Sequence, residues 1–289
     1  MSTRHKLSRR AFLKVVGAAA SVAVLEACVP QASEPDVVPT ATVVQPQPTF
    51  TVGPTATPVP TPTPTPVEIE PIVPEMVLVK AGSFEMGSAD GRPDEQPVHT
   101  VTITYPFYVA RYAVTFDEYD LFYLDRPGGG VRKPDDGGLG RGTRPVEVTW
   151  SNAVAYCNWL SEKGGLNPCY SGKGRLTQCD FAADGYRLPT EVEWEYAARG
   201  GQKSQGYTYA GSDNLDDVAW YADNSGGQLR PVGQKQPNEL GLYDMSGNTW
   251  EWCWDWYGKA YYASSPASDP RGPASNPDIL RVKRGGRAD

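Results

Sequence analysis

Alternation of apolar and polar side chains predicts three short strands early in the globular part of the chain. The runs are residues 76–79 (MVLV), residues 98–104 (VHTVTIT) and residues 107–112 (FYVARY). Each is brief and bounded by turn-forming residues, as strands of small sheets usually are.

Helical periodicity with clear start and stop signals predicts three helices. Thr115 with Glu118 forms a capping box before a helix at residues 116–124, and Thr190 with Glu193 forms another after Pro189. Residues 150–163 form a longer helical run that ends at Gly164-Gly165. Long irregular stretches separate these elements, so the pattern indicates an α+β domain dominated by loops.

The run GNTWEWCWDW at residues 247–256 has the period of a strand. It puts four indoles on one face (Trp250, Trp252, Trp254 and Trp256) and Glu251, Cys253 and Asp255 on the other. Indoles bury large apolar areas, so we expect the indole face to pack in the core. The acidic face with its thiol is the candidate for a site.

The N-terminus is typical of an exported lipoprotein. Residues 1–27 combine the twin-arginine pattern SRRAFLK with a short apolar stretch, which predicts an export signal. Leu25-Glu26-Ala27-Cys28 resembles a lipobox, which predicts lipidation at Cys28 and anchoring at the bacterial cell membrane or surface. Simple signal cleavage, with Cys28 incidental, is the alternative.

Residues 28–74 predict a disordered tether between the anchor and the domain. Residues 29–74 hold 13 of the 27 prolines, with threonine and valine between them. Such a run cannot build a packed core and favours an extended, solvated chain. The remaining residues, 75–289, are enough for one domain with a sizeable core.

Charge and histidine content exclude several function classes. Residues 1–27 hold five of the 27 basic and one of the 34 acidic residues, which leaves a net charge of −11 for the rest. Such an acidic chain is a poor partner for nucleic acid or anionic membrane surfaces. One histidine, His99, remains beyond residue 27, and we interpret it as structural. So few histidines exclude histidine-ligated zinc sites and a histidine-based triad.

Four cysteines follow Cys28. Cys169 and Cys179 bracket a short polar loop, and in an exported protein this spacing predicts a disulfide. Cys157 lies on the apolar face of the 150–163 helix and is interpreted as a buried thiol. Cys253 is ambiguous, and spacing leaves a pair with Cys157 open.

Four motifs together resemble the formylglycine-generating enzyme, or sulfatase-modifying factor, family. They are MVLVKAGSFEMGS at residues 76–88, RLPTEVEWEYAARGG at 187–201, GLYDMSGNTWEW at 241–252 and RVKRGG at 281–286. The resemblance implies a C-type-lectin-like fold with little regular secondary structure.

The resemblance also implies an activity: oxidation of a cysteine of a client sulfatase to formylglycine with O2, at copper(I) held by two cysteines. In the family those cysteines follow the GG motif, whereas here Arg287-Ala288-Asp289 follow Gly286. We therefore expect the C-terminal part of the domain to be missing from this sequence, and no catalytic cysteine is assigned. Copper is expected only where such cysteines exist.

By position, the resemblance implies a structural calcium site in the tryptophan-rich motif. Asp244 and Glu251 would supply carboxylates, and Gly247 and Thr249 would supply backbone carbonyls. The family's other calcium site is left unassigned. The alternative is Glu251 hydrogen-bonded to protein groups with no metal.

Two functions are carried forward. The first is an exported, lipid-anchored oxidase of the formylglycine-generating type that acts on a sulfatase. The second is a non-catalytic, lectin-like surface lipoprotein that binds an unknown ligand through the same scaffold.

Overall fold

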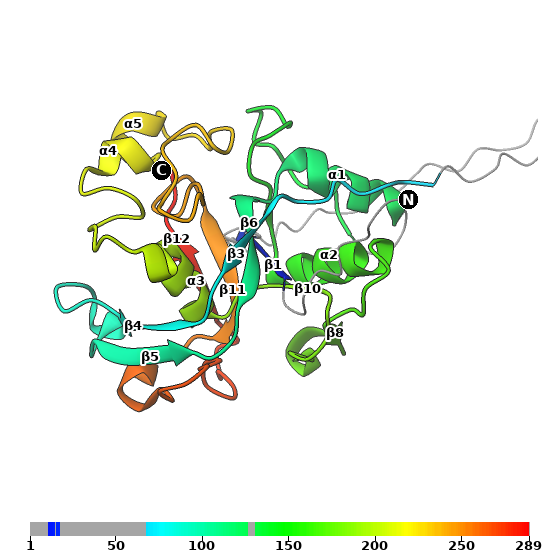
Figure 1. The fold of residues 1–289 in the computed structure, drawn as a ribbon. Coiled ribbons are helices and arrows are strands. Elements are labelled where there is room, and N and C mark those ends of the chain that lie inside the picture. The colour runs from blue at the N-terminus through cyan, green and yellow to red at the C-terminus, as the bar shows by residue number, and fades with distance from the viewer. Residues whose placement is uncertain (1–10, 15, 18–67, 127–130, 289) are drawn as a thin grey trace, which may run out of the picture. The chain divides into compact units, whose positions relative to one another are not determined.

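The computed structural model describes residues 11–14, 16–17, 68–126 and 131–288, which belong to one compact unit (Figure 1). Cys28 and residues 28–67 of the predicted tether lie outside the described residues. No helix within the described ranges is long and apolar enough to cross a bilayer.

The first sheet joins segments that are far apart in the sequence. Its order is β10 (Tyr186–Arg187), β1 (Ala11–Lys14), β6 (Phe107–Ala113) and β3 (Met76–Val79). β3 pairs with β6 antiparallel, and β1 runs parallel to both β6 and β10. The strands predicted at residues 76–79 and 107–112 are thus confirmed.

The second sheet contains the tryptophan-rich strand. Its order is β12 (Arg281–Gly285), β11 (Trp250–Trp256), β2 (Val16–Gly17) and β7 (Glu147–Val148). β11 and β12 form an antiparallel pair in which Trp250 faces Gly285. The sequence predicted β11, whereas it gave no sign that residues 11–17 contribute to either sheet.

Two hairpins complete the strands. β4 (Gly82–Met86) pairs with β5 (His99–Ile103), and β8 (Tyr170–Ser171) pairs with β9 (Gln178–Cys179). β5 lies within the predicted run at residues 98–104. His99 at its start packs edge-on against Tyr262, which agrees with a structural role.

The three predicted helices are confirmed, with their caps. Both capping boxes form, at Thr115 and Thr190, and the longest helix ends at Gly164. The helices are α1 (Phe116–Asp125), α2 (Trp150–Lys163), α3 (Glu191–Ala198), α4 (Leu215–Val218) and α5 (Ala222–Ser225), with short 3-10 turns η1 (Pro93–Glu95), η2 (Gly174–Leu176), η3 (Gly201–Lys203) and η4 (Tyr261–Ser264).

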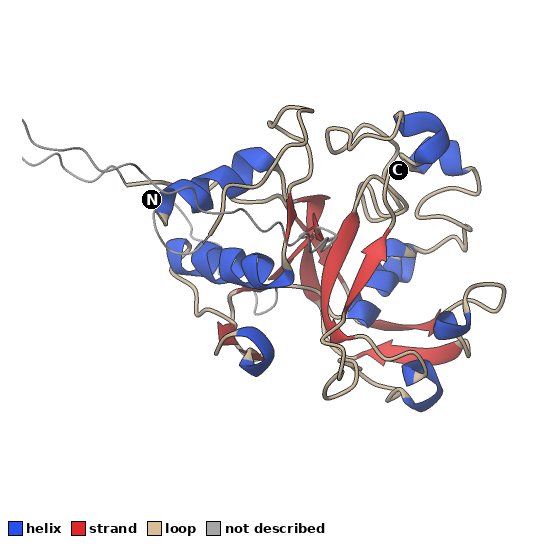
Figure 2. Ribbon diagram, turned by 180° about the vertical axis from the view of Figure 1, so that it is seen from behind, coloured by secondary structure: helices blue, strands red, loops and turns tan. Residues whose placement is uncertain are grey.

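Two hydrophobic clusters form the core. α1 and α2 pack together around an aromatic group that includes Tyr119, Phe122, Tyr156 and Trp159. The second cluster joins α3 to β3, β5, β6 and β11. Helix α2, which belongs to the first cluster, lies on one side of β11, and α3, which belongs to the second, lies on the other (Figure 2).

A buried ion pair joins β10 to α3. Arg187 donates two hydrogen bonds of 2.7 Å to Glu193, and neither side chain is more than 2% exposed. Burial would raise the pKa of Glu193, but the Arg187 guanidinium outweighs this and holds the pKa below its usual 4.5. Glu193 is also the capping-box residue of α3, so one carboxylate fixes both the helix start and its position on the sheet.

Arg187→Met is predicted to lower the free energy of unfolding by about 3–5 kcal/mol, because Glu193 would remain buried without its partner. Urea unfolding at pH 7 measures the loss. The matched control is Arg126→Met, whose partner Glu162 is exposed, and its effect should be at most about 1 kcal/mol.

The same loss should shrink as the pH falls below 4.5, because the folded-state pKa of Glu193 is depressed and its stabilisation disappears on protonation. Equal losses in the buried and exposed pairs at pH 7 would contradict this role.

Candidate functional site

Strand β11 turns its acidic face, rather than its indole face, into the interior. Glu251, Cys253 and Asp255 are at most 2% exposed, whereas the four indoles are partly exposed. The prediction of a core indole face is therefore wrong in part, since only Trp252 and Trp254 pack against the first hydrophobic cluster.

The buried acids are tolerated because each meets hydrogen-bond donors. Glu251 accepts a 2.8 Å bond from the indole N–H of Trp194, and Asp255 accepts one of 2.8 Å from the backbone N–H of Glu191. Both donors belong to α3. Burial raises the pKa of Glu251 and of Asp255, because the carboxyl groups lose their water. The two donors of α3 replace part of the hydrogen bonding that water gave.

Two cations of β12 cover the indole face. The Arg281 guanidinium lies 3.4 Å from the ring centre of Trp256 and 4.0 Å from that of Trp150. Lys283 lies 5.6 Å from Trp250 and 5.5 Å from Trp252. Such cation–π contacts contribute about 0.5–2 kcal/mol each.

Neither Arg281 nor Lys283 forms an ion pair with an acidic side chain in the described part of the chain. Arg281 donates to the backbone carbonyl of Trp254, and burial lowers its pKa to about 10. The indole face therefore carries positive charge that the described acids do not neutralise by direct contact.

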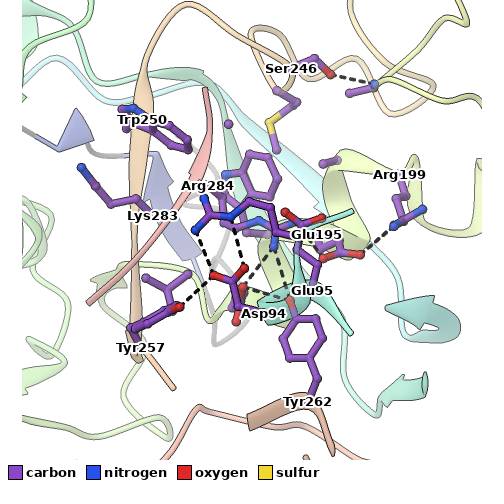
Figure 3. A pocket seen from close by; sticks show the side chains of 18 of the residues that line it. Asp94, Glu95, Glu195, Arg199, Ser246, Trp250, Tyr257, Tyr262, Lys283 and Arg284 are labelled. Atoms are coloured by element: carbon purple, nitrogen blue, oxygen red, sulfur yellow. Dashed lines mark hydrogen bonds and ion pairs between the residues drawn. The ribbon is translucent and has the colours of Figure 1, made fainter. Parts of the chain in front are cut away.

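On the other face of β12, a saturated charge network connects the strand to α3 (Figure 3). Arg284 contacts Glu191 at 3.1 Å and Glu195 at 2.8 Å, and Glu195 also binds Arg199 at 2.9 Å. Burial opposes the charge of Arg284, but the two carboxylates outweigh it and raise its pKa. Arg284 thus has its charge matched within the protein.

A pocket of about 810 Å³ lies at this edge of β12 and is the candidate functional site. The volume is within the roughly 300–1,000 Å³ of small-molecule sites. Its aromatic lining residues are Trp194, Tyr207, Tyr209, Trp250, Trp256, Tyr257, Tyr261 and Tyr262. Its charged lining residues are Arg92, Asp94, Glu95, Glu191, Glu195, Arg199, Arg281, Lys283 and Arg284.

Residues of η1 and its N-cap, Arg92, also line the pocket. Asp94 accepts a 2.8 Å bond from the hydroxyl of Tyr257 and pairs with Arg92 at 3.2 Å. The Tyr257 hydrogen bond, more than Arg92, holds the pKa of Asp94 below its usual value. Sequence reasoning missed this part of the pocket, because η1 reaches the pocket only through tertiary folding.

The four predicted calcium ligands lie in one loop and at the start of β11. Asp244 and Glu251 are buried, and both interact electrostatically with Lys14. The carbonyl of Gly247 accepts a 2.8 Å bond from the backbone N–H of Thr249. The side-chain oxygens Oγ1 of Thr249 and Oε1 of Glu251 are buried and make no hydrogen bond.

This donor set suits a hard cation in chemistry, but one cationic side chain, Lys14, already lies beside it. Lys14 Nζ lies 3.5 Å from Glu251 Oε1 and donates to the backbone carbonyl of Tyr243. With Lys14 in this place, the site does not fit a calcium ion, because the buried ammonium of Lys14 would repel a second cation. The calcium site stays a prediction, and it would require Lys14 to leave these carboxylates.

The cysteines lie apart from the pocket. Cys157, Cys169 and Cys253 are buried and Cys179 is half-buried, so Cys157 is the buried thiol that the sequence predicted, and the structure joins none of the four in a disulfide. Burial raises the pKa of Cys169 to about 11 and of Cys179 to about 12. No cysteine lines the pocket in the described part of the chain.

The architecture described above defines the class of protein: a loop-rich α+β domain with two small sheets and a pocket beside a tryptophan-rich strand. Comparison with known proteins then identifies the family. The model of the sulfatase-modifying factor enzyme 1-like domain matches residues 62–288, and the chain belongs to this family. The fold predicted from the resemblance is thereby confirmed.

Relatives of the chain differ in what their names describe. It is 40% identical to "Chaperone protein LppX" of Paenibacillus barcinonensis, over 63% of this chain and 72% of that protein. It is 30% identical to the formylglycine-generating enzyme of Streptomyces coelicolor, over 73% and 77%. The solved structure of Treponema denticola variable protein 1 matches with a TM-score of 0.62 and 34% identity, over 74% of this chain and 83% of that one.

The disulfide between Cys169 and Cys179 stays a prediction. The β8–β9 hairpin pairs Tyr170 with Cys179, and the amide of Asp180 donates to the carbonyl of Cys169, so Cys169, just before β8, lies beside the end of β9 that carries Cys179. Non-reducing peptide mapping of protein prepared under oxidising conditions should show the two residues linked. Free thiols at both positions would contradict the prediction.

Proposed function

We propose that this domain is a ligand-binding head whose pocket beside β12 takes a ligand with an anionic group. The observation that carries the proposal is the pair Arg281 and Lys283, which have no ion-pair partner among the described acids and lie on partly exposed indole surface. A carboxylate, sulfate or phosphate would supply the charge that these cations lack.

The aromatic walls favour a ligand with a flat or weakly polar body. Trp250 and Trp256 lie at the two ends of β11 and both line the pocket, with Lys283 close to Trp250 (Figure 3). Aromatic side chains offer a large contact area with little loss of conformational entropy. An acidic sugar or a short acidic peptide has this combination of body and charge.

Arg284 and Arg199 are assigned a different role. Both are held by Glu195, and Arg284 also by Glu191, so a ligand anion would have to displace a protein carboxylate to reach them. They fix the shape of the pocket, and Lys283 recognises the ligand.

Oxidation of a client cysteine is the second candidate function. It is favoured by the family and by the 30% identity to the Streptomyces coelicolor enzyme. Copper(I) would require paired thiolates, and the four described thiols do not fit this, because burial raises the pKa of each of them and none reaches the pocket. Ligand binding is therefore the function that the geometry favours.

The place of action is proposed from the N-terminal sequence. Export through the twin-arginine signal and lipidation at Cys28 would put the head on a tether at the bacterial cell surface. Palmitate labelling that disappears in the Cys28→Ser variant tests the anchor, and unlabelled wild-type protein would contradict it.

Lys283→Met is predicted to weaken binding of an anionic probe at least tenfold, which is about 1.4 kcal/mol. Quenching of tryptophan fluorescence by glucose 6-sulfate, glucose 6-phosphate and glucuronate, each compared with glucose, measures the effect. Binding should weaken as ionic strength rises. Lys173→Met, at an exposed position of the β8–β9 hairpin, is the matched control and should bind like the wild type.

Binding of neutral glucose as tight as that of the charged probes would contradict the anion assignment. So would equal affinities in the Lys283 and Lys173 variants.

For the second candidate, the 289-residue chain is predicted to consume no oxygen above background with copper(I) and a Cys-x-Pro-x-Arg peptide. An oxygen electrode measures the rate, and a formylglycine-generating enzyme serves as positive control. Turnover that is lost on alkylation of the cysteines would show that the oxidase assignment is the right one.

A further inference from the structure

Residues 11–14 and 16–17 form two strands, β1 and β2, each inserted into one of the two larger sheets. β1 lies between β6 and β10 and pairs with both, with Phe12 opposite Val109 on one side and Arg187 on the other. β2 then lies between β11 and β7, where Val16 pairs with Glu251 and with Glu147. In Figure 1 this segment is drawn in dark blue beside β6 and β10.

Both sheets depend on this segment for their continuity. β10 joins the first sheet through β1, and β7 joins the second through β2, within the part of the chain that the structure describes. The amide of Val114 donates a 2.8 Å bond to the carbonyl of Lys14. Without residues 11–17, buried backbone groups of four strands would lose their partners, which is costly in a protein interior.

The side chain of Lys14 makes the insertion selective. Lys14 is fully buried, lies 3.5 Å from Glu251 Oε1 and donates to the carbonyl of Tyr243. A slip of one residue along the strand would turn this side chain to the other face and leave Glu251 without its cation. The strands and carboxylates around this segment therefore set both its backbone direction and the position of its basic residue.

We propose that the space between β6 and β10, continued between β11 and β7, is a strand-acceptor site for an extended peptide with a basic residue at the Lys14 position. The strands β1 and β2 of this chain, residues 11–14 and 16–17, are its occupant. Recognition is by β-augmentation: backbone pairing gives affinity, and the buried carboxylates of Glu251 and Asp244 give specificity.

The site also connects to the predicted export signal at residues 1–27. The occupant lies within that signal, so any step that removes residues 1–27 opens the acceptor site. An open site would present two buried carboxylates and the unpaired edges of four strands, β6, β10, β11 and β7. A second strand of the same chemistry could then enter, as could a divalent cation at the carboxylates.

Hydrogen exchange on the intact chain tests the occupancy directly. The amides of residues 12–14 and of Val114 should exchange at least a hundredfold more slowly than unstructured amides. Exchange of these amides at unprotected rates would overturn the proposal, whatever the behaviour of any variant.

A double-mutant cycle in the full chain tests the selectivity. Lys14→Met should lower the melting temperature by several degrees, and Lys14→Met with Glu251→Gln should recover most of the loss, because the buried charge is then removed. Lys80→Met, at an exposed position after β3, is the control and should change nothing. No loss in Lys14→Met, or no recovery in the double variant, would overturn the proposal.

A peptide added in trans tests the site as a receptor. The full chain with Lys14→Glu rejects its own segment, because a carboxylate would face Glu251, and should bind a fluorescent peptide of residues 9–19 by anisotropy. The same peptide with Lys14→Glu should bind at least tenfold more weakly. Equal binding of the two peptides would overturn the proposed selectivity. Where this variant does not fold, the hydrogen-exchange result on the wild type decides.

Discussion

The structure depends on one constraint: strand β11 buries its acidic face. Glu251 and Asp255 leave water entirely, and ionised carboxylates in such a place require compensating donors or cations. Helix α3 supplies the indole N–H of Trp194 and the first backbone amide of the helix, at Glu191. An amide at a helix N-terminus is a favourable partner for an anion. The acids of β11 thereby fix where α3 begins and how it lies against the sheet.

The burial of the acids also determines what the indoles do. With Glu251, Cys253 and Asp255 inside, alternate residues of the strand must face the other way. The indoles at the two ends of β11 then reach the pocket, and the cations Arg281 and Lys283 of the paired strand cover them. The orientation of β11 thus produces both the core contact with α3 and the cation–aromatic wall to which we assign ligand binding.

Local sequence signals predicted the helices and most strands, because capping boxes and period-two runs act over a few residues. They predicted that the indole face of β11 is inside, which is wrong in part, because distant segments of the chain decide which face of a strand is covered. They did not predict that residues 11–17 pair with β6, β10, β11 and β7, because strand insertion depends on long-range register. The pocket wall at η1 was missed for the same reason. The predicted metal ligands lie close together, but the cation beside them in the structure is the ammonium of Lys14.

The orientation of β11 is tested most directly by ¹⁹F spectra of protein labelled with 5-fluorotryptophan, recorded with a soluble nitroxide. Trp→Phe variants assign the signals. The account predicts strong broadening for Trp250 and Trp256, which are partly exposed and line the pocket, and a sharp signal for Trp159, which is 1% exposed and lies away from it. Signals from Trp250 and Trp256 as sharp as that of Trp159 would mean that the indole face is inside, and would contradict the account.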